Sequence, residues 1–201
     1  MPEWFKIQMT HFGVEPEEDR FHFKRIDKKA ELDIGGIAIQ CVLFYDYLYT
    51  DSAGVSGKLG AVGSDADIGV LASLPHLSTA EHTATLKVDC LYVDAGGVNV
   101  GATIKGRDSS LAPPVIMTPR SGWWSCASER GGGIACLLEM MRTIKISGSQ
   151  RDVMFTVNTG HELNYIGLGH YSSQRRDLIR NAHRWIHFYH TGKSIFLSSL
   201  Q

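Results

Sequence analysis

Three residues in the second half of the chain carry side chains suited to acid–base or metal chemistry: Glu129, His161 and Glu162. Carboxylates and imidazoles are common zinc ligands and general bases. The spacing is not that of a zincin, because Tyr165 occupies the place of the second histidine in His-Glu-x-x-His. We therefore take these three residues as candidate catalytic groups that the fold must bring together.

The segments around these residues predict a strand, a helix and a second strand in that order. Residues 115–118 and 152–159 are short apolar runs, as expected of strands covered on both faces. A triple glycine at 131–133 opens an amphipathic helix that Gly148 ends. The helical spacing is carried by Ile134, Leu137, Leu138, Met141 and Ile144. Such a unit makes parallel strands whose carboxyl ends meet at one edge, where ligands bind.

The chain divides into three parts. Residues 1–33 are charged and aromatic without a sustained period, and predict an arm or a peripheral helix. Residues 34–80 combine β-branched and aromatic runs with frequent glycines, and predict a small strand-rich region. Residues 81–201 predict an α/β domain with a three-layer, mostly parallel sheet and flanking helices.

Within the α/β part, three further elements are predicted. The sequence Ala-Gly-Gly at 95–97 predicts a turn that joins two strands into a hairpin. Residues 173–184 predict a second helix, and residues 185–190 a strand. Three parallel strands alone would leave an exposed sheet edge. We expect the N-terminal arm, a second copy or another protein to cover it.

Composition excludes several classes of function. Hydrophobic residues make up 43% and charged residues 20% of the 201 residues, as in ordinary globular proteins. The 20 basic residues nearly balance the 21 acidic ones, so no net field favours nucleic acid or an anionic membrane. The N-terminus lacks the pattern of a secretory signal, and no apolar run approaches about 20 residues. We expect a cytoplasmic protein with reduced thiols, in which Cys41, Cys90 and Cys136 pack as small hydrophobes.

Residues 97–192 resemble the zinc aminopeptidase family, which includes bacterial leucyl aminopeptidases and glutamate carboxypeptidase, with glutaminyl cyclase as a relative. The motifs that carry the resemblance appear in the family's order. They are NVGATIKG (99–106), PVIMTPRS (114–121), ERGGGIACLLEMMR (129–142), VMFTVNTGHE (153–162), GLGHY (167–171) and WIHFYHTG (185–192). The resemblance implies a zinc-exopeptidase-like fold that is C-terminally short, and the region before it is weakly similar to a protease-associated domain.

The resemblance also assigns the family's site residues, and most of them are replaced. The first ligand histidine corresponds to Pro119, and the aspartate that orients it to Ser121. The bridging aspartate corresponds to Glu129, followed by Arg130 in place of asparagine. A guanidinium at that position favours an ion pair over metal binding.

The later site positions are replaced in part. The general-base glutamate corresponds to His161, whereas the adjacent metal-binding glutamate is kept as Glu162. The aspartate of the last strand corresponds to Tyr189, or to His190 after a one-residue slip. Zinc needs three or more protein ligands, so this set does not assemble the family's two-metal site.

Other constellations remain open. A single metal could be held by Glu129, Glu162 and His190 together with His161, and a continuous helix would align His183, His187 and His190. Cys126, just before the glycine-initiated helix, could act as a nucleophile with His161 as its base.

Two tryptophans complete the set of candidates. Trp123 and Trp124 lie in a loop at a strand end, where they could form a stacking wall for a ligand. Arg130 joins them as a candidate ligand-binding residue.

The leading interpretation is a divergent aminopeptidase-like protein that has lost most of the two-zinc site and acts as a binding or assembly module. It needs no cofactor, and its partner is a protein or a second copy. The alternative is a metal-dependent hydrolase, of the peptidase or amidase type and with zinc as cofactor, rebuilt around Glu129, His161 and Glu162. The sequence leaves open whether the protein is an enzyme.

Overall fold

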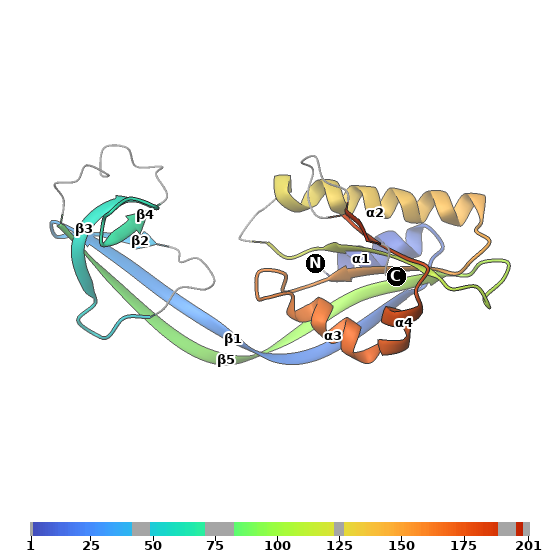
Figure 1. The fold of residues 1–201 in the computed structure, drawn as a ribbon, viewed down its shortest axis with the longest axis horizontal. Coiled ribbons are helices and arrows are strands. Elements are labelled where there is room, and N and C mark those ends of the chain that lie inside the picture. Colours follow the sequence, from blue (N-terminus) through green and yellow to red (C-terminus); the bar gives the residue numbers. More distant parts are fainter. Residues whose placement is uncertain (1, 42–48, 71–82, 123–126, 189–195, 199–201) are drawn as a thin grey trace. The chain divides into compact units, whose positions relative to one another are not determined.

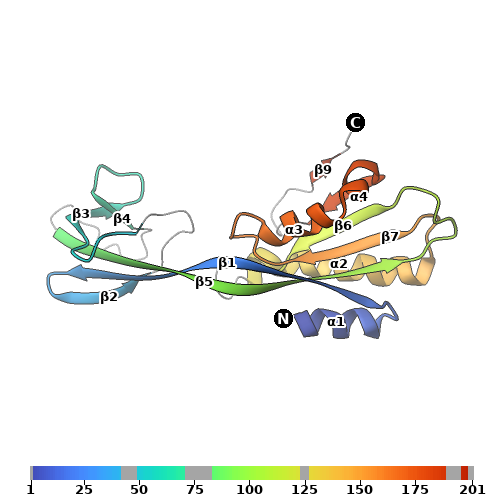
Figure 2. The same ribbon diagram turned by 90° about the horizontal axis from the view of Figure 1, so that it is seen from below.

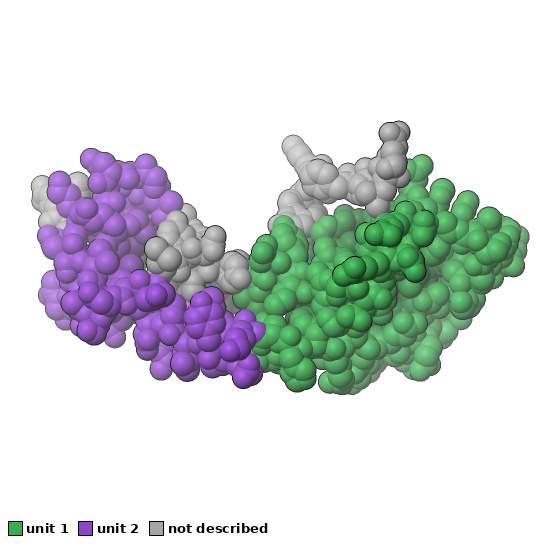
Figure 3. All heavy atoms as spheres, turned by 60° about the horizontal axis from the view of Figure 1, so that its bottom comes forward, with its two compact units in different colours: residues 1–23, 95–201 green, residues 24–94 purple. Residues whose placement is uncertain are grey.

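The computed structural model of the protein describes residues 2–41, 49–70, 83–122, 127–188 and 196–198. The chain forms two compact units, which are distinguished by colour in Figure 3. Unit 1 comprises residues 1–23 and 95–201, and unit 2 comprises residues 24–94. Strands β1 (Pro16–Ile34) and β5 (Thr83–Ile104) contribute residues to both units.

The sheet of unit 1 is built around three parallel strands. Strand β6 (Pro114–Pro119) lies between β7 (Val153–Asn158) and β8 (Arg184–His187) and runs parallel to both. Strand β5 continues the sheet beyond β7 in antiparallel register, with Val100 opposite Val157. Strand β9 (Phe196–Ser198) pairs antiparallel with β8 at the other side.

Helices cover both faces of this sheet (Figures 1 and 2). Helices α1 (Pro2–His11) and α2 (Ala127–Ser147) lie on one face. Helices α3 (Ile166–Gln174) and α4 (Arg176–Asn181) lie on the other. The arrangement is therefore the three-layer α/β architecture that the sequence predicts.

The core of unit 1 lies between the sheet and the helices α1 and α2. Phe5 and Met9 of α1 and Leu137 and Met141 of α2 are fully buried. The strands meet them with alternate residues, because successive side chains of a strand point to opposite faces. These strand residues are Val100, Ala102, Ile104, Ile116, Val153, Phe155 and Val157.

The predicted strand, helix and strand are confirmed as β6, α2 and β7, and the strand after them as β8. The sheet as a whole is more mixed than predicted, since antiparallel strands flank the parallel group on both sides. Strand β1, which belongs to the predicted N-terminal arm, lies next to β5 in the strand order. The chain itself thus extends the sheet beyond the three parallel strands.

The predicted hairpin turn at residues 95–97 is wrong, because β5 is continuous through Gly96 and Gly97. The reason is a contact with β1. An added Cβ at Gly97 would lie 2.3 Å from Cζ of Phe21, so this glycine makes room for an aromatic ring and does not form a turn.

Helix boundaries also differ from the prediction. Helix α2 begins at Ala127, so the glycines lie inside its second turn. A Cβ at Gly133 would lie 2.8 Å from the Thr118 hydroxyl oxygen, which shows a close approach of helix and strand. The helix predicted for residues 173–184 is replaced by α3 and α4, which meet at Arg175.

Two predicted cysteine environments are present and one is not. Cys41 and Cys90 are half-buried, whereas Cys136 is exposed on α2. The buried face of α2 carries Leu137 and Met141, and Cys136 lies outside this stripe.

Unit 2 contains strands and no helix among its described residues. Strand β2 (Ile37–Cys41) pairs antiparallel with β1. Strand β3 (Val55–Ala61) pairs antiparallel with β5 and parallel with β4 (Ile68–Val70). Unit 2 has a small core of its own, which consists of Leu32, Ile34, Leu59, Ile68 and Ala84.

Across the ranges that the structure describes, none of the helices has the length and apolar character needed to cross a membrane.

Candidate functional site

The candidate site lies at the carboxyl ends of β6 and β7. Strand β6 leads into Arg120 and Ser121, and β7 into the loop that carries His161 and Glu162. Asn99 of β5 holds this loop: its side-chain oxygen accepts a hydrogen bond from the Thr159 amide at 3.1 Å. Its side-chain nitrogen donates to the Gly167 carbonyl at 2.8 Å. Asn99 therefore fixes both ends of the loop.

The loop itself is tightly wound. Asn164 and Tyr165 adopt positive φ values of 56° and 57°, which are uncommon for residues with side chains. Gly167, the second residue of α3, lies so close to the end of β7 that an added Cβ would lie 2.2 Å from the Thr159 carbonyl oxygen. This geometry turns His161 and Glu162 back toward the end of β6.

Arg130 lies at the centre of the site. It extends the buried stripe of α2 that continues as Gly133, Leu137 and Met141, with the three- and four-residue spacing of one helix face. Its side chain is only 5% exposed. The stripe that packs α2 on the sheet thus also brings this guanidinium to the strand ends.

The guanidinium of Arg130 joins two carboxylates from different elements. Its Nη2 donates to Oε1 of Glu162 and lies 2.7 Å from Oε1 of Glu129. Its Nε donates to the Ser121 carbonyl at 2.6 Å. The ion pair that the sequence predicts at Glu129 and Arg130 is present, and it also includes Glu162.

Ser121 connects the two strand ends. Its hydroxyl donates to Oε2 of Glu162 at 2.9 Å and accepts a hydrogen bond from the His161 amide at 3.0 Å. Burial acts to raise the pKa of Glu162, but the hydrogen bonds from Arg130 and Ser121 outweigh it, so this pKa lies below its ordinary value. Glu162 is therefore an ionised acceptor whose two oxygens are both engaged.

Two imidazoles border the cluster. Burial, reinforced by the charge of Arg130, lowers the pKa of His161 below 6.5. Burial and the neighbouring His161 and Arg130 lower the pKa of His187 in the same way. Both side chains are consequently neutral at pH 7, and His161 packs edge-on against Tyr165 with ring centroids 4.4 Å apart.

A shallow pocket opens beside these imidazoles. Its walls come from the ends of the parallel strands and from α3 and the loop before it: Met117, Pro119, Asn158, Thr159, His161, Tyr165, Leu168 and His187. Asn158 is 4% exposed, and its side-chain Oδ1 has no hydrogen-bond partner while its Nδ2 donates to Thr156. The pocket thus combines apolar walls with an unused buried acceptor, which suits a ligand that carries a donor.

The structure brings together four of the sequence-predicted site residues: Glu129, Arg130, His161 and Glu162. The charges of the other three all act on His161. Trp123, Trp124, Cys126, Tyr189 and His190 lie outside the described residues. The predicted strand at the last site segment is confirmed for Arg184–His187, so His183 and His187 do not share a helix face.

The described residues at these strand ends do not fit a zinc site. Arg130 lies between the two carboxylates that the family resemblance equates with metal ligands, and Pro119, which it equates with the first ligand histidine, offers no ligand atom. No group of three or more histidine, cysteine or carboxylate side chains within the described ranges is arranged to hold a metal ion. Zinc would have to displace a buried guanidinium that makes several charge-assisted hydrogen bonds.

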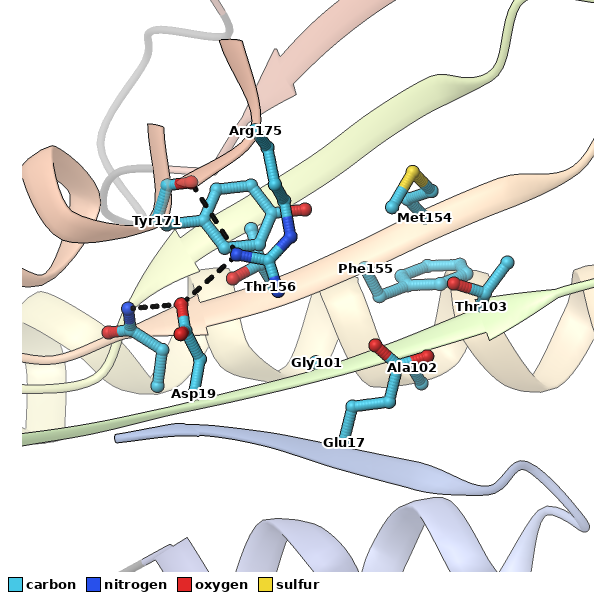
Figure 4. A pocket seen from close by; sticks show the side chains of 11 residues that line it. Glu17, Asp19, Gly101, Ala102, Thr103, Met154, Phe155, Thr156, Tyr171 and Arg175 are labelled. Carbon is cyan, nitrogen blue, oxygen red and sulfur yellow. Dashed lines mark hydrogen bonds and ion pairs between the residues drawn. The ribbon is translucent and has the colours of Figure 1, made fainter. Parts of the chain in front are cut away.

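A second pocket lies on the face of the sheet that α3 covers (Figure 4). Arg175 stacks over the Tyr171 ring at 4.2 Å and donates to Asp19 at 3.2 Å. Asp19 also contacts His170 at 3.2 Å. Burial raises the pKa of Tyr171 to about 12. This network ties β1 to α3 and thereby supports the loop of the candidate site.

The sequence does not single out Asn99, Asn158 or Arg120 at this edge. The position of Asn158 at the end of an apolar run was the available signal, because polar residues at the carboxyl end of a buried strand commonly face a site. The pairings of Asn99 with Thr159 and Gly167 span 60 and 68 residues, and no local pattern reveals them.

No protein-family model matches this chain, and no curated protein sequence matches it. Solved structures do. An aminopeptidase from Aneurinibacillus sp. strain AM-1 superposes with a TM-score of 0.65 at 16% identity, over 96% of this chain and 65% of that one. A zinc aminopeptidase from Bacillus subtilis gives 0.66 at 13%, over 95% and 62%.

A peptidase M28 precursor from Shewanella amazonensis SB2B gives a TM-score of 0.61 at 11% identity, over 90% of this chain and 63% of that one. The chain thus spans less than two thirds of the length of these structures. At such identities the likeness concerns the fold, and the fold of this chain is zinc-exopeptidase-like.

Proposed function

We propose that this chain is a non-catalytic, aminopeptidase-like binding or assembly module. One observation carries the proposal: Arg130 joins Glu129 and Glu162, the two positions that the family resemblance equates with metal ligands. A fixed cation there supplies charge neutralisation without a metal. A guanidinium does not activate a bridging water to attack a substrate, whereas a two-metal site does.

The binding function is supported by the pocket at the strand ends. Zinc hydrolases need a polarised carbonyl and an activated water, whereas this pocket has neutral imidazoles, apolar walls and the unpaired Oδ1 of Asn158. A ligand or partner segment with an apolar group and one donor complements that lining.

The assembly function would use the sheet edges, where a second copy or another protein can add a strand. Within the described residues, β2 and β9 are the ends of the strand order. Light scattering tests the homo-oligomeric form, which requires a mass of two or more chains of 22.2 kDa each. A monomer would restrict this role to a different partner chain. A cytoplasmic location belongs to the same proposal.

The test against catalysis is an assay with aminoacyl and dipeptide reporters in the presence of added zinc, manganese or cobalt. We expect no turnover above that of Glu162→Ala. Metal-dependent turnover that is lost in Glu162→Ala and kept in the surface variant Glu139→Ala would instead establish the rebuilt hydrolase. Glu139 is a suitable control because it pairs with Arg142 on the exposed face of α2.

A further inference from the structure

Arg120, the residue after β6, is a buried guanidinium for which the described chain supplies almost no partners. The residue is 9% exposed. Its Nη2 donates to the Val98 carbonyl at 2.6 Å, and its Nε is buried without a hydrogen-bond partner. No carboxylate among the described residues forms an ion pair with it. The Arg120 guanidinium is therefore largely removed from water, and among the described residues a single backbone carbonyl accepts a hydrogen bond from its side chain.

The contrast with Arg130 shows how unusual this is within the same site. Arg130 is buried to a similar degree but has two carboxylates and the Ser121 carbonyl. Buried charges are ordinarily paired, because an unpaired one forfeits its hydration without compensation. Burial accordingly lowers the pKa of Arg120. Even so, an arginine stays charged at neutral pH.

We propose that Arg120 anchors a binding site for a small oxyanion of the carboxylate or phosphate type. A guanidinium presents its donors in a planar fork that matches two oxygens of such an ion. One branch of the fork is fixed by Nη2, which donates to the Val98 carbonyl. The buried Nε has no acceptor within the described residues, so an ion that reaches this edge of the guanidinium gains a donor that the chain leaves unsatisfied.

This inference does not rest on the proposed function, because it concerns a cation outside the Arg130 cluster. An anion site at Arg120 predicts that the melting temperature of the protein rises with the concentration of the anion. An ion that binds only the folded chain raises its melting temperature, by about 3–6 °C at ten times the dissociation constant for a protein of this size.

The experiment follows thermal unfolding in a zwitterionic buffer with phosphate or acetate, and compares it with chloride at equal ionic strength. Wild type and Arg142→Met, which removes an exposed arginine, are expected to show the oxyanion-specific rise. Arg120→Met is expected to lose it and to show only the general salt effect. Without oxyanion, Arg120→Met is expected to melt no lower than wild type, since replacing an uncompensated buried charge by an apolar chain is often neutral or stabilising.

A second readout uses the wild-type protein alone, so it stands even if Arg120→Met fails to fold. The Nε–Hε resonance of Arg120 should shift saturably during the titration, and the salt that shifts it assigns the site to phosphate-type or carboxylate-type ions. The proposal is overturned if neither salt shifts this resonance, or if a folded Arg120→Met responds to oxyanions as strongly as wild type does.

Discussion

At the scale of single residues, the site is governed by where one guanidinium lies. Arg130 is nearly buried, and Glu162 is 10% exposed, so their pairing takes place with little water to screen it. Glu129 is 37% exposed and contributes from the rim. The cluster satisfies its own charges, which is why removing a member should be costly even though the intact cluster adds little net stability.

Replacing Glu162 by glutamine tests this cost. Glu162→Gln removes the negative charge of the more buried of the two described carboxylates that pair with Arg130, and we expect the free energy of unfolding to fall by about 3 kcal/mol. The matched control is Glu139→Gln, which breaks an exposed pair with Arg142 and should cost less than about 1 kcal/mol. Urea unfolding at pH 7 measures both. Equal losses in the two variants would contradict the assigned geometry.

The imidazoles predict a pH dependence. The pKa values of His161 and His187 are lowered from 6.5 in the folded state, first of all by burial. Above pH 6.5 both states are mostly neutral and the full stability is present. As the pH falls below 6.5, the unfolded chain takes up protons that the folded chain refuses, so the free energy of unfolding decreases.

Denaturant unfolding at pH 7.5 and 5.5 measures this decrease. We expect a smaller loss in His161→Gln and in His187→Gln than in wild type, because each variant lacks one of the groups whose pKa is lowered in the folded state. A wild-type stability that rises between pH 7.5 and 5.5 would refute the assignment.

The sequence predicted the residues of the cluster better than their contacts. The adjacency of Glu129 and Arg130 and the family resemblance were enough to predict an ion pair in place of a metal. The hydroxyl of Ser121, which joins Glu162 to the His161 amide, could not be predicted because it depends on a contact across 40 residues. The sequence also gives no sign that Arg120 lacks a carboxylate partner among the described residues, because this depends on how the chain packs.

At the scale of elements, the long strand β5 positions the site from the side. It carries Asn99, which holds the loop with His161 and Glu162, and it pairs with β7 from Val100 to Ile104. Its continuity depends on Gly97, over which the Phe21 ring packs, while Phe21 in turn stacks on His170 at 4.8 Å. Elements with a strong local period, such as α2 and β7, were predictable, whereas β5 was not, because glycines that serve a distant contact look like a turn.

Two neighbouring glycines test the continuous strand. Gly97→Ala would place its Cβ 2.3 Å from Phe21 Cζ, and we expect a loss of about 1–3 kcal/mol in the free energy of unfolding. Gly96→Ala meets no atom within 4 Å and should be neutral or stabilising by less than about 1 kcal/mol. If 95–97 formed a hairpin turn instead, both glycines would occupy turn positions that favour positive φ, and both substitutions would be destabilising to a similar extent. Thermal unfolding of the two variants distinguishes these outcomes.

At the scale of the whole molecule, the comparisons concern the fold alone. The chain superposes on two aminopeptidases over 95% or more of its length at 13–16% identity, so the framework is shared although few residues are. The framework still directs both strand-end loops to one place. At that place the Arg130 guanidinium joins Glu129 and Glu162, and the proposed function rests on these contacts.

The zinc content of the purified protein tests most directly whether Arg130, and not a metal ion, neutralises Glu129 and Glu162. The purified protein is dialysed against micromolar zinc, and bound metal is quantified for wild type, Glu162→Ala and the control Glu139→Ala. We expect no stoichiometric zinc in any of the three, because Arg130 occupies the carboxylates. One or more zinc ions per wild-type chain, held at submicromolar affinity and lost only in Glu162→Ala, would contradict the account.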